Sequence, residues 1–123
     1  MKIIATQNAP QAIGPYSQAI LANGILYTSG QIGLTPQGEL LGDISVQTRQ
    51  VLSNLKEVLK TGGSDLNKVI KTTIFLSNME DFGIVNEIYA EFFGTHKPAR
   101  STVAVKTLPK NALVEIECIA LAD

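Results

Sequence analysis

The stretch LVEIECIAL at residues 113–121 decides the fold of this 123-residue chain. Its even positions are all apolar, whereas its odd positions mix two glutamates with leucine and isoleucine. Because side chains alternate between the two faces of a strand, the even positions should face a covering layer and the odd positions the opposite side. The stretch therefore predicts a strand that is covered on one face and partly apolar on the other.

The rest of the sequence predicts the order β-β-β-α-β-α-β-β within a single domain at 1–123. Asn23-Gly24 marks a hairpin, and residues 30–42 are rich in glycine and should form a loop. Asp43 can cap a helix from Ile44 that stops at Gly62-Gly63. A second helix should start near residue 77 or 78 and close at Gly94. The expected strands are 2–6, 16–22, 25–29, 69–76, 101–105 and 113–121.

Two amphipathic helices can cover only one face of this sheet, which gives an α+β fold with both helices on one side. Strand 69–76 is also apolar on both sides, with Val69 and Phe75 opposed to Ile70, Ile74 and Leu76. Other copies of the chain are therefore expected to cover the second face. A large exposed groove is the alternative interpretation.

Composition limits the function classes. The formal net charge is −1 and no basic stripe is present, which argues against a nucleic-acid partner. No apolar run is long enough to span a membrane, and the first residues do not resemble a signal peptide, so a cytoplasmic protein is expected. The single Cys118 and single His96 cannot form an internal disulfide or a structural zinc site. His96 should be a solvated loop residue, which argues against a Ser-His-Asp triad.

Two charged residues are the main candidates for chemistry. Glu117 stands in an apolar strand, where burial would raise its pKa toward neutrality and allow it to carry protons. The alternative is that Glu115 and Glu117 form salt bridges at an interface. Arg100 follows Lys97-Pro98-Ala99, opens a strand and could hold a carboxylate bidentately. The alternative is a solvated surface arginine.

Polar residues near strand ends are the secondary candidates. Tyr16 places a phenol just before the hairpin, and Ser29 could donate a hydroxyl hydrogen bond. Gly30, directly after it, would let a ligand approach the backbone closely. Asn86 lies within the second expected helix and is most simply a residue of its polar face.

Together these segments resemble the RidA/YjgF family of reactive-intermediate deaminases, which also carries the name L-PSP endoribonuclease. The similarity covers essentially the whole chain, and the PARS and VEIE segments are its most specific parts. The matching segments are AIGPYSQ (12–18), SGQI (29–32), DF (81–82), VN (85–86), KPARS (97–101), LPK (108–110) and VEIE (114–117).

The resemblance implies a chorismate-mutase-like mixed sheet whose copies close into a barrel as a homotrimer, with active sites between subunits. It implies hydrolysis of 2-iminobutanoate and 2-iminopropanoate, the imine tautomers of enamines released by pyridoxal-phosphate dehydratases, to 2-oxo acids and ammonia. Small 2-imino and 2-oxo carboxylates would be the ligands, and no metal or other cofactor is expected. A metabolite-binding regulator and an RNA-cleaving enzyme are the alternatives.

The resemblance also implies roles for individual residues. Arg100 would bind the substrate carboxylate, and Glu117 would orient and activate water. Ser29 and Tyr16 would line the pocket from the neighbouring subunit, with Asn86 nearby. Thr102 stands where many relatives carry cysteine, and the contact there is expected to be chiefly through the main chain. Cys118 is expected in the core.

Overall fold

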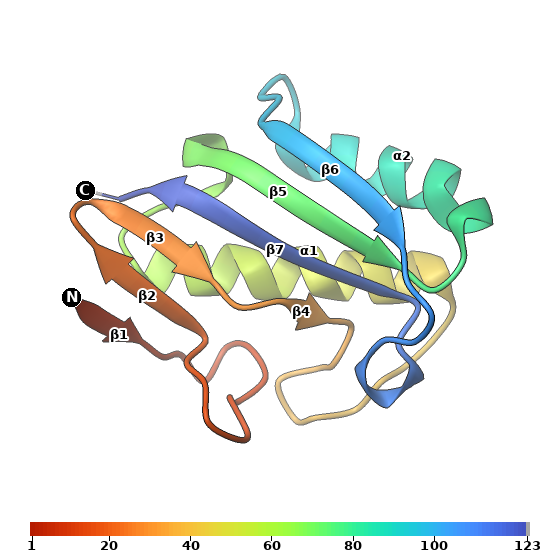
Figure 1. The fold of residues 1–123 in the computed structure, drawn as a ribbon, viewed down its shortest axis with the longest axis horizontal. Helices are drawn as coiled ribbons and strands as arrows, with labels where there is room; N and C mark the ends of the chain where they lie inside the picture. Colours follow the sequence, from red (N-terminus) through yellow and green to blue (C-terminus); the bar gives the residue numbers. More distant parts are fainter. Residues whose placement is uncertain (123) are drawn as a thin grey trace.

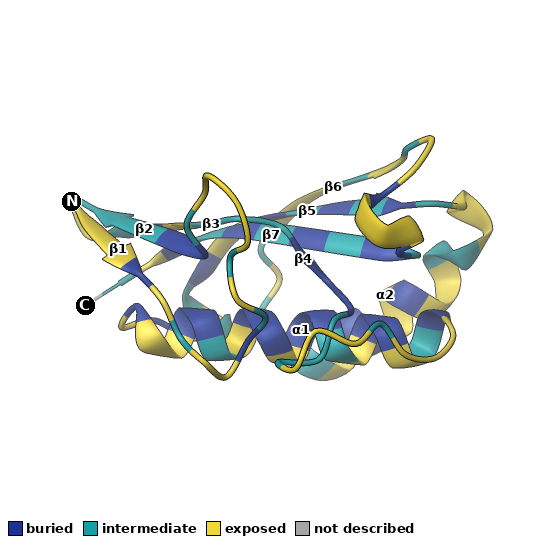
Figure 2. Ribbon diagram, turned by 90° about the horizontal axis from the view of Figure 1, so that it is seen from below, coloured by how far each residue is buried: buried dark blue, intermediate teal, exposed yellow. Residues whose placement is uncertain are grey.

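Strand β7 (Val114–Leu121) lies in the middle of the sheet in a computed structural model that describes residues 1–122 (Figure 1). Helices α1 (Ile44–Thr61) and α2 (Phe82–Phe93) both cover one face of this sheet (Figure 2). The predicted α+β class, with two helices on one side, is confirmed. The remaining strands are β1 (Lys2–Ile4), β2 (Ala19–Ala22), β3 (Ile25–Thr28), β4 (Gln31–Ile32), β5 (Val69–Leu76) and β6 (Ala99–Ala104).

The sheet is mixed. Its strand order is β1-β2-β3-β7-β5-β6, and the short β4 also pairs with β7. All neighbours are antiparallel except β5 and β6, which run parallel because α2 connects them. Strand β7 therefore holds together the N-terminal strands and the β5–β6 pair.

The alternation along β7 places its side chains as predicted. Val114, Ile116 and Ala120 are fully buried and Cys118 is 4% exposed, all in the core cluster beneath the helices. Burial raises the pKa of the Cys118 thiol to about 11, so this sulfur stays protonated at neutral pH. The odd positions, by contrast, are only half-buried or exposed. We call the side of the sheet that these odd positions share the open face.

Helix α1 begins and ends where its sequence signals predict. The Oδ1 atom of Asp43 accepts a hydrogen bond from the backbone N–H of Val46, which caps the first turn. Gly63, at a φ of 83°, then turns the chain away from the helix. Neither helix within residues 1–122 has the length and apolarity that crossing a membrane would require.

The predicted loop at 30–42 contains a strand that the sequence pattern does not reveal. Gln31 and Ile32 form β4 and pair with Ile116 and Glu115 of β7. The Nδ2 atom of Asn54, in α1, donates to the carbonyl oxygen of Ile32 at 3.3 Å and thereby ties this strand to the helix layer. Two residues are too few to show an alternating pattern, and so the strand appears only in the tertiary structure.

Several element boundaries differ from the prediction. The strand expected at 16–22 begins at Ala19, because the residues before it bond to loops instead of to a neighbouring strand. Helix α2 begins at Phe82, since Asn78 caps a preceding 3₁₀ turn at Met79–Asp81. Strand β6 begins two residues earlier than expected, at Ala99.

The face assignment of Val69 is wrong. Val69 is 2% exposed and packs in the core beneath the helices, together with Ile74 and Leu76. The register of β5 against β7 shifts between Val69 and Lys71, and such a bulge inverts the alternation on one side of it. Ile70 is consequently 42% exposed.

Candidate active site

Glu115 is the central acidic residue of a cavity at the β4 side of the sheet. Its side chain lies against the backbone of Gly30 so closely that a Cβ atom there would come within 2.6 Å of Oε2. Burial raises the pKa of the Glu115 carboxyl, and the nearby charge of Glu117 raises it further. The structure thus provides a half-buried carboxyl group with an elevated pKa, at the position two residues before the predicted Glu117.

This cavity has a volume of about 530 Å³, and we call it the Tyr16 cavity. It brings together three of the residues predicted for the site, namely Tyr16, Ser29 and Gly30, and adds Glu115. Its other lining residues are Pro10, Gln11, Ile13, Gln18, Gln31, Ile32, Leu34, Pro109 and Lys110.

Hydrogen bonds fix the wall of the Tyr16 cavity. The Ser29 hydroxyl donates to the carbonyl oxygen of Ser17 at 2.5 Å, so in this arrangement its oxygen is left as an acceptor. Gln18, only 3% exposed, accepts from the backbone N–H of Thr6 at 2.7 Å and donates to the carbonyl oxygen of Pro10 at 2.7 Å. Gln18 has no role in the sequence prediction, because a glutamine that clamps a distant loop carries no local signal.

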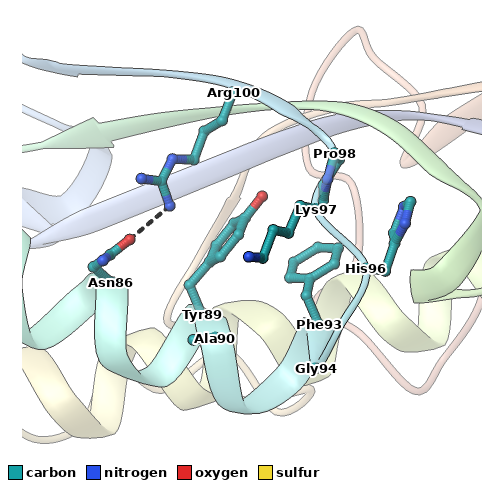
Figure 3. A pocket seen from close by; sticks show the side chains of 9 residues that line it. All are labelled: Asn86, Tyr89, Ala90, Phe93, Gly94, His96, Lys97, Pro98 and Arg100. Atoms are coloured by element: carbon teal, nitrogen blue, oxygen red, sulfur yellow. Dashed lines mark hydrogen bonds between the residues drawn. The ribbon is translucent and has the colours of Figure 1, made fainter.

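Arg100 lies on the other side of the sheet, at a second cavity of about 450 Å³ between α2 and the start of β6 (Figure 3). Its Nη1 atom donates to Oδ1 of Asn86 at 2.8 Å. The guanidinium carbon lies 4.9 Å from the ring centre of Tyr89 and 5.4 Å from that of Phe82. No carboxylate within residues 1–122 pairs with Arg100. The side chain is therefore oriented by neutral groups and keeps its capacity to bind an anion.

The aromatic support of Arg100 is itself anchored. The phenol of Tyr89 shares a hydrogen bond of 2.7 Å with the buried hydroxyl of Thr72 in β5. Burial raises the pKa of Tyr89, so its phenol is neutral at physiological pH. We call the cavity lined by these side chains the Arg100 cavity, and its remaining lining residues are Ala90, Phe93, Gly94, His96, Lys97 and Pro98.

His96 is not the solvated loop residue that was predicted. Its Nε2 atom lies 2.7 Å from the carbonyl oxygen of Val69, and the residue is half-buried. The ring therefore ties the segment before β6 to the start of β5. It lies far along the chain from Ser29 and lines the other cavity.

Two predicted site residues line neither cavity. Glu117 is half-buried and lies on the open face, between Glu115 and Ile119 of the same strand. Its partner in the register of β5 is Thr73. Thr102 lies two residues after Arg100 in β6 and on the same, helix-covered face, which is opposite to the face of Glu117. Its Oγ1 atom is buried and is the only buried side-chain oxygen or nitrogen of residues 1–122 without a hydrogen-bond partner.

The sheet thus separates the predicted site into two groups within one chain. Arg100 aligns with Thr72 and Cys118 on the helix-covered face, whereas Glu115 and Glu117 lie on the open face. Neither the Arg100 cavity nor the Tyr16 cavity contains both the guanidinium and a carboxyl group.

Comparison with known proteins identifies the family to which this fold belongs. The Endoribonuclease L-PSP family matches residues 6–122. A RutC family protein of Pyrococcus horikoshii is 54% identical over 99% of this chain and 98% of its own length. The 2-iminobutanoate/2-iminopropanoate deaminase of mouse is 49% identical over 98% of this chain and 90% of its own. The chain belongs to this family, the RidA/YjgF family of the sequence prediction.

A solved structure supports the same assignment. The crystal structure of E. coli TdcF with bound serine superposes with a TM-score of 0.96 at 42% identity, and the match covers 100% of both chains. The family and the fold predicted from the sequence are confirmed. The TdcF structure holds a bound serine.

Proposed function

We propose that this protein is a homotrimeric enzyme that hydrolyses 2-iminobutanoate and 2-iminopropanoate to 2-oxo acids and ammonia. The observation that carries the proposal is the separation of Arg100 from the Tyr16 cavity by the sheet of one chain. A guanidinium without an anionic partner and a carboxyl group of raised pKa are complementary halves of one site. The name of the mouse relative supports the reaction class.

Trimer formation would unite the two halves. The open face exposes large apolar side chains in adjacent strands, among them Ile3, Tyr27 and Leu121. A contiguous apolar surface of this kind is typical of a protein interface. In the proposed trimer the open faces form the inner barrel, and each cleft combines Arg100 of one subunit with the Tyr16 cavity of the next.

Arg100 would hold the substrate carboxylate. Asn86 and the rings of Tyr89 and Phe82 fix the direction of its planar group, so that two parallel hydrogen bonds to a carboxylate require little reorganisation. Asn86 then acts mainly by positioning Arg100. The hydroxyl of Thr102 is buried within the chain, so any contact of this residue with the ligand would be through its main chain.

Glu115 would carry the proton. The oxygen of a water molecule adds to the electrophilic imine carbon, and a proton passes from that water through Glu115 to the nitrogen. In the resulting carbinolamine the hydroxyl proton then passes to the nitrogen, the C–N bond breaks, ammonia leaves, and the C=O bond of the 2-oxo acid forms. A carboxyl group of raised pKa is suited to accepting and returning a proton near neutral pH. The Gly30 backbone, Ser29 and Tyr16 would line the reacting group.

The water-activating role that the sequence predicts for Glu117 is here assigned to Glu115, because Glu115 lines the cavity and Glu117 does not. Glu117 would contribute through its charge, which raises the pKa of Glu115. The variants Glu115→Gln and Glu117→Gln separate these roles.

The direct test couples the protein to a threonine dehydratase and follows the lifetime of the released imine. We expect 2-oxobutanoate to appear faster than in the dehydratase reaction alone, without added metal. Tight binding of 2-oxobutanoate with no acceleration would instead support the metabolite-binding alternative. Incubation with RNA under the same conditions should leave the RNA intact. The proposal would be contradicted if the purified protein degraded the RNA and a Glu115→Gln variant did not.

A further inference from the structure

Lys110 is a charged residue at the Tyr16 cavity to which neither the sequence prediction nor the proposed reaction gives a role. Of the described residues that line this cavity, Lys110 is the single cation and Glu115 the single anion. Lys110 is exposed, and no hydrogen bond or ion pair engages its amine within residues 1–122. The cavity therefore has a free positive charge at its rim and a half-buried carboxyl group inside.

The backbone holds Lys110 in a sterically unfavourable conformation. Lys110 has a φ of 56° and a ψ of 23°, and Asn111 follows with a φ of 56°. Asparagine tolerates this left-handed region, whereas a lysine there brings its Cβ atom too close to the neighbouring peptide. A glycine at residue 110 would relieve that contact, so the lysine side chain is retained at a steric cost. Strain of this kind concentrates at functional sites.

The ends of the loop are fixed, so the strained residue has a defined place at the rim. Leu108 is 5% exposed and Ala112 is 1% exposed, and both pack in the small cluster that includes Ile32. Between them the N–H of Asn111 donates to the carbonyl oxygen of Leu108 at 3.0 Å. The N–H of Ala112 likewise donates to the carbonyl oxygen of Pro109 at 3.1 Å. The direction in which the Lys110 side chain leaves the backbone is accordingly set by the fold.

From this placement we infer that Lys110 draws anionic ligands into the Tyr16 cavity and makes the site selective for carboxylates over neutral analogues. The inference rests on the proposed function and names a further specificity-determining residue for it. Glu115 and Glu117 create a negative potential that repels a 2-imino carboxylate before Arg100 can contact it. A cation at the rim offsets this repulsion, and rim charges act mainly on the rate of association and on its salt dependence.

The test is a kinetic comparison of Lys110→Met, Lys110→Arg and the control Lys106→Met, all in the trimer. Methionine keeps most of the length of the side chain and the backbone strain but removes the charge. Lys106 is also exposed, precedes the same loop and lines neither cavity. For Lys110→Met we expect kcat/KM for 2-iminobutanoate to fall about 3- to 10-fold at low ionic strength, with kcat within about twofold of wild type.

Five further results should accompany this change. The difference should shrink toward zero at about 0.5 M salt, because exposed charges are then screened. Lys110→Arg should restore kcat/KM, and Lys106→Met should match the wild type. Inhibition by 2-oxobutanoate should weaken in Lys110→Met, whereas inhibition by the neutral 2-oxobutanamide should not change.

Two outcomes would overturn the inference, namely an unchanged kcat/KM in Lys110→Met or an equal loss in Lys106→Met. A protein that hydrolyses no imine would refute the proposed function instead. In that case the Kd values of 2-oxobutanoate and 2-oxobutanamide, measured by calorimetry on the same variants, still decide the role of Lys110.

Discussion

The guanidinium of Arg100 is held by Asn86 and two aromatic rings, and each of these contacts depends on its planar shape. Arg100→Lys preserves the charge but loses the fork and the stacking. We expect kcat/KM for 2-iminobutanoate to fall at least tenfold, or about 1.4 kcal/mol of transition-state stabilisation. Arg49→Lys is the matched control, since Arg49 pairs with Glu91 on the exposed surface and should leave the kinetics unchanged. Wild-type kinetics in both variants would show that Arg100 does not bind the substrate.

Replacement of Glu115 by glutamine should change activity and stability at neutral pH in opposite directions. Its pKa is raised in the folded protein, first by burial and then by Glu117, so the folded state binds this proton more tightly than the unfolded chain does. The resulting stabilisation is complete below the unfolded carboxyl pKa and is lost as pH rises through the folded pKa. Glutamine at residue 115 cannot ionise, so the Glu115→Gln variant does not lose this stabilisation as pH rises. Its melting temperature minus that of wild type should therefore increase from acid to neutral pH. Its turnover should fall roughly 10²- to 10⁴-fold.

Glu117→Gln separates the two glutamates. Removing the neighbouring charge should lower the pKa of Glu115, so the acidic limb of the pH profile of kcat/KM should move to lower pH while substantial turnover persists. If Glu117→Gln abolishes turnover and Glu115→Gln does not, then Glu117 activates water, as the sequence alone predicts. The sequence could not distinguish the two residues, because both occupy odd positions of one strand and only tertiary contact with Gly30 and the β4 loop buries Glu115 in the cavity.

Among the elements, β4 depends on an unusually close approach to α1. A Cβ atom on Gly33 would lie 2.9 Å from Cα and 3.0 Å from the carbonyl oxygen of Gln47, and these backbone atoms cannot move without displacing the helix. We expect Gly33→Ala to lower the free energy of unfolding by about 1–3 kcal/mol. The measurement is a denaturant titration with Gly83→Ala as control. A Cβ on Gly83 would meet nothing within 4 Å, so that variant should be unchanged or slightly more stable. A Gly33→Ala protein as stable as wild type would show that the backbone after β4 can move away from α1 without a cost in stability.

Long elements with strong local signals were predictable, and features formed by distant contacts were not. Helix α1 could be located from Asp43, its apolar stripe and the two glycines, because all three signals are local. The bulge after Val69 could not be located, since it arises from pairing with β7. The same division holds in the candidate site. The local PARS segment indicated Arg100, whereas the clamp formed by Gln18 and the rim position of Lys110 depend on loops that fold together from different parts of the chain.

At the scale of the whole molecule, the open face leads to a prediction about assembly. Light scattering at micromolar concentration should give the mass of three chains. Tyr27→Lys places a charge in the row that joins Ile3, Ile20 and Ile119, and it should dissociate the trimer and abolish imine turnover together. Val46→Lys is the control, because Val46 is similarly exposed but lies on α1, on the helix side. A monomer with full activity would contradict a site shared between subunits.

The central place of β7 also has a consequence for synthesis. Strands β3 and β5, its neighbours on either side, are made long before it, and they contact each other only through it. While the chain grows on the ribosome, the N-terminal strands and the β5–β6 pair therefore exist as two separate parts with unpaired edges. The sheet can close only after residues 114–121 leave the exit tunnel. Until then those edges can pair with other chains, and chaperone demand should be greatest just before β7 emerges.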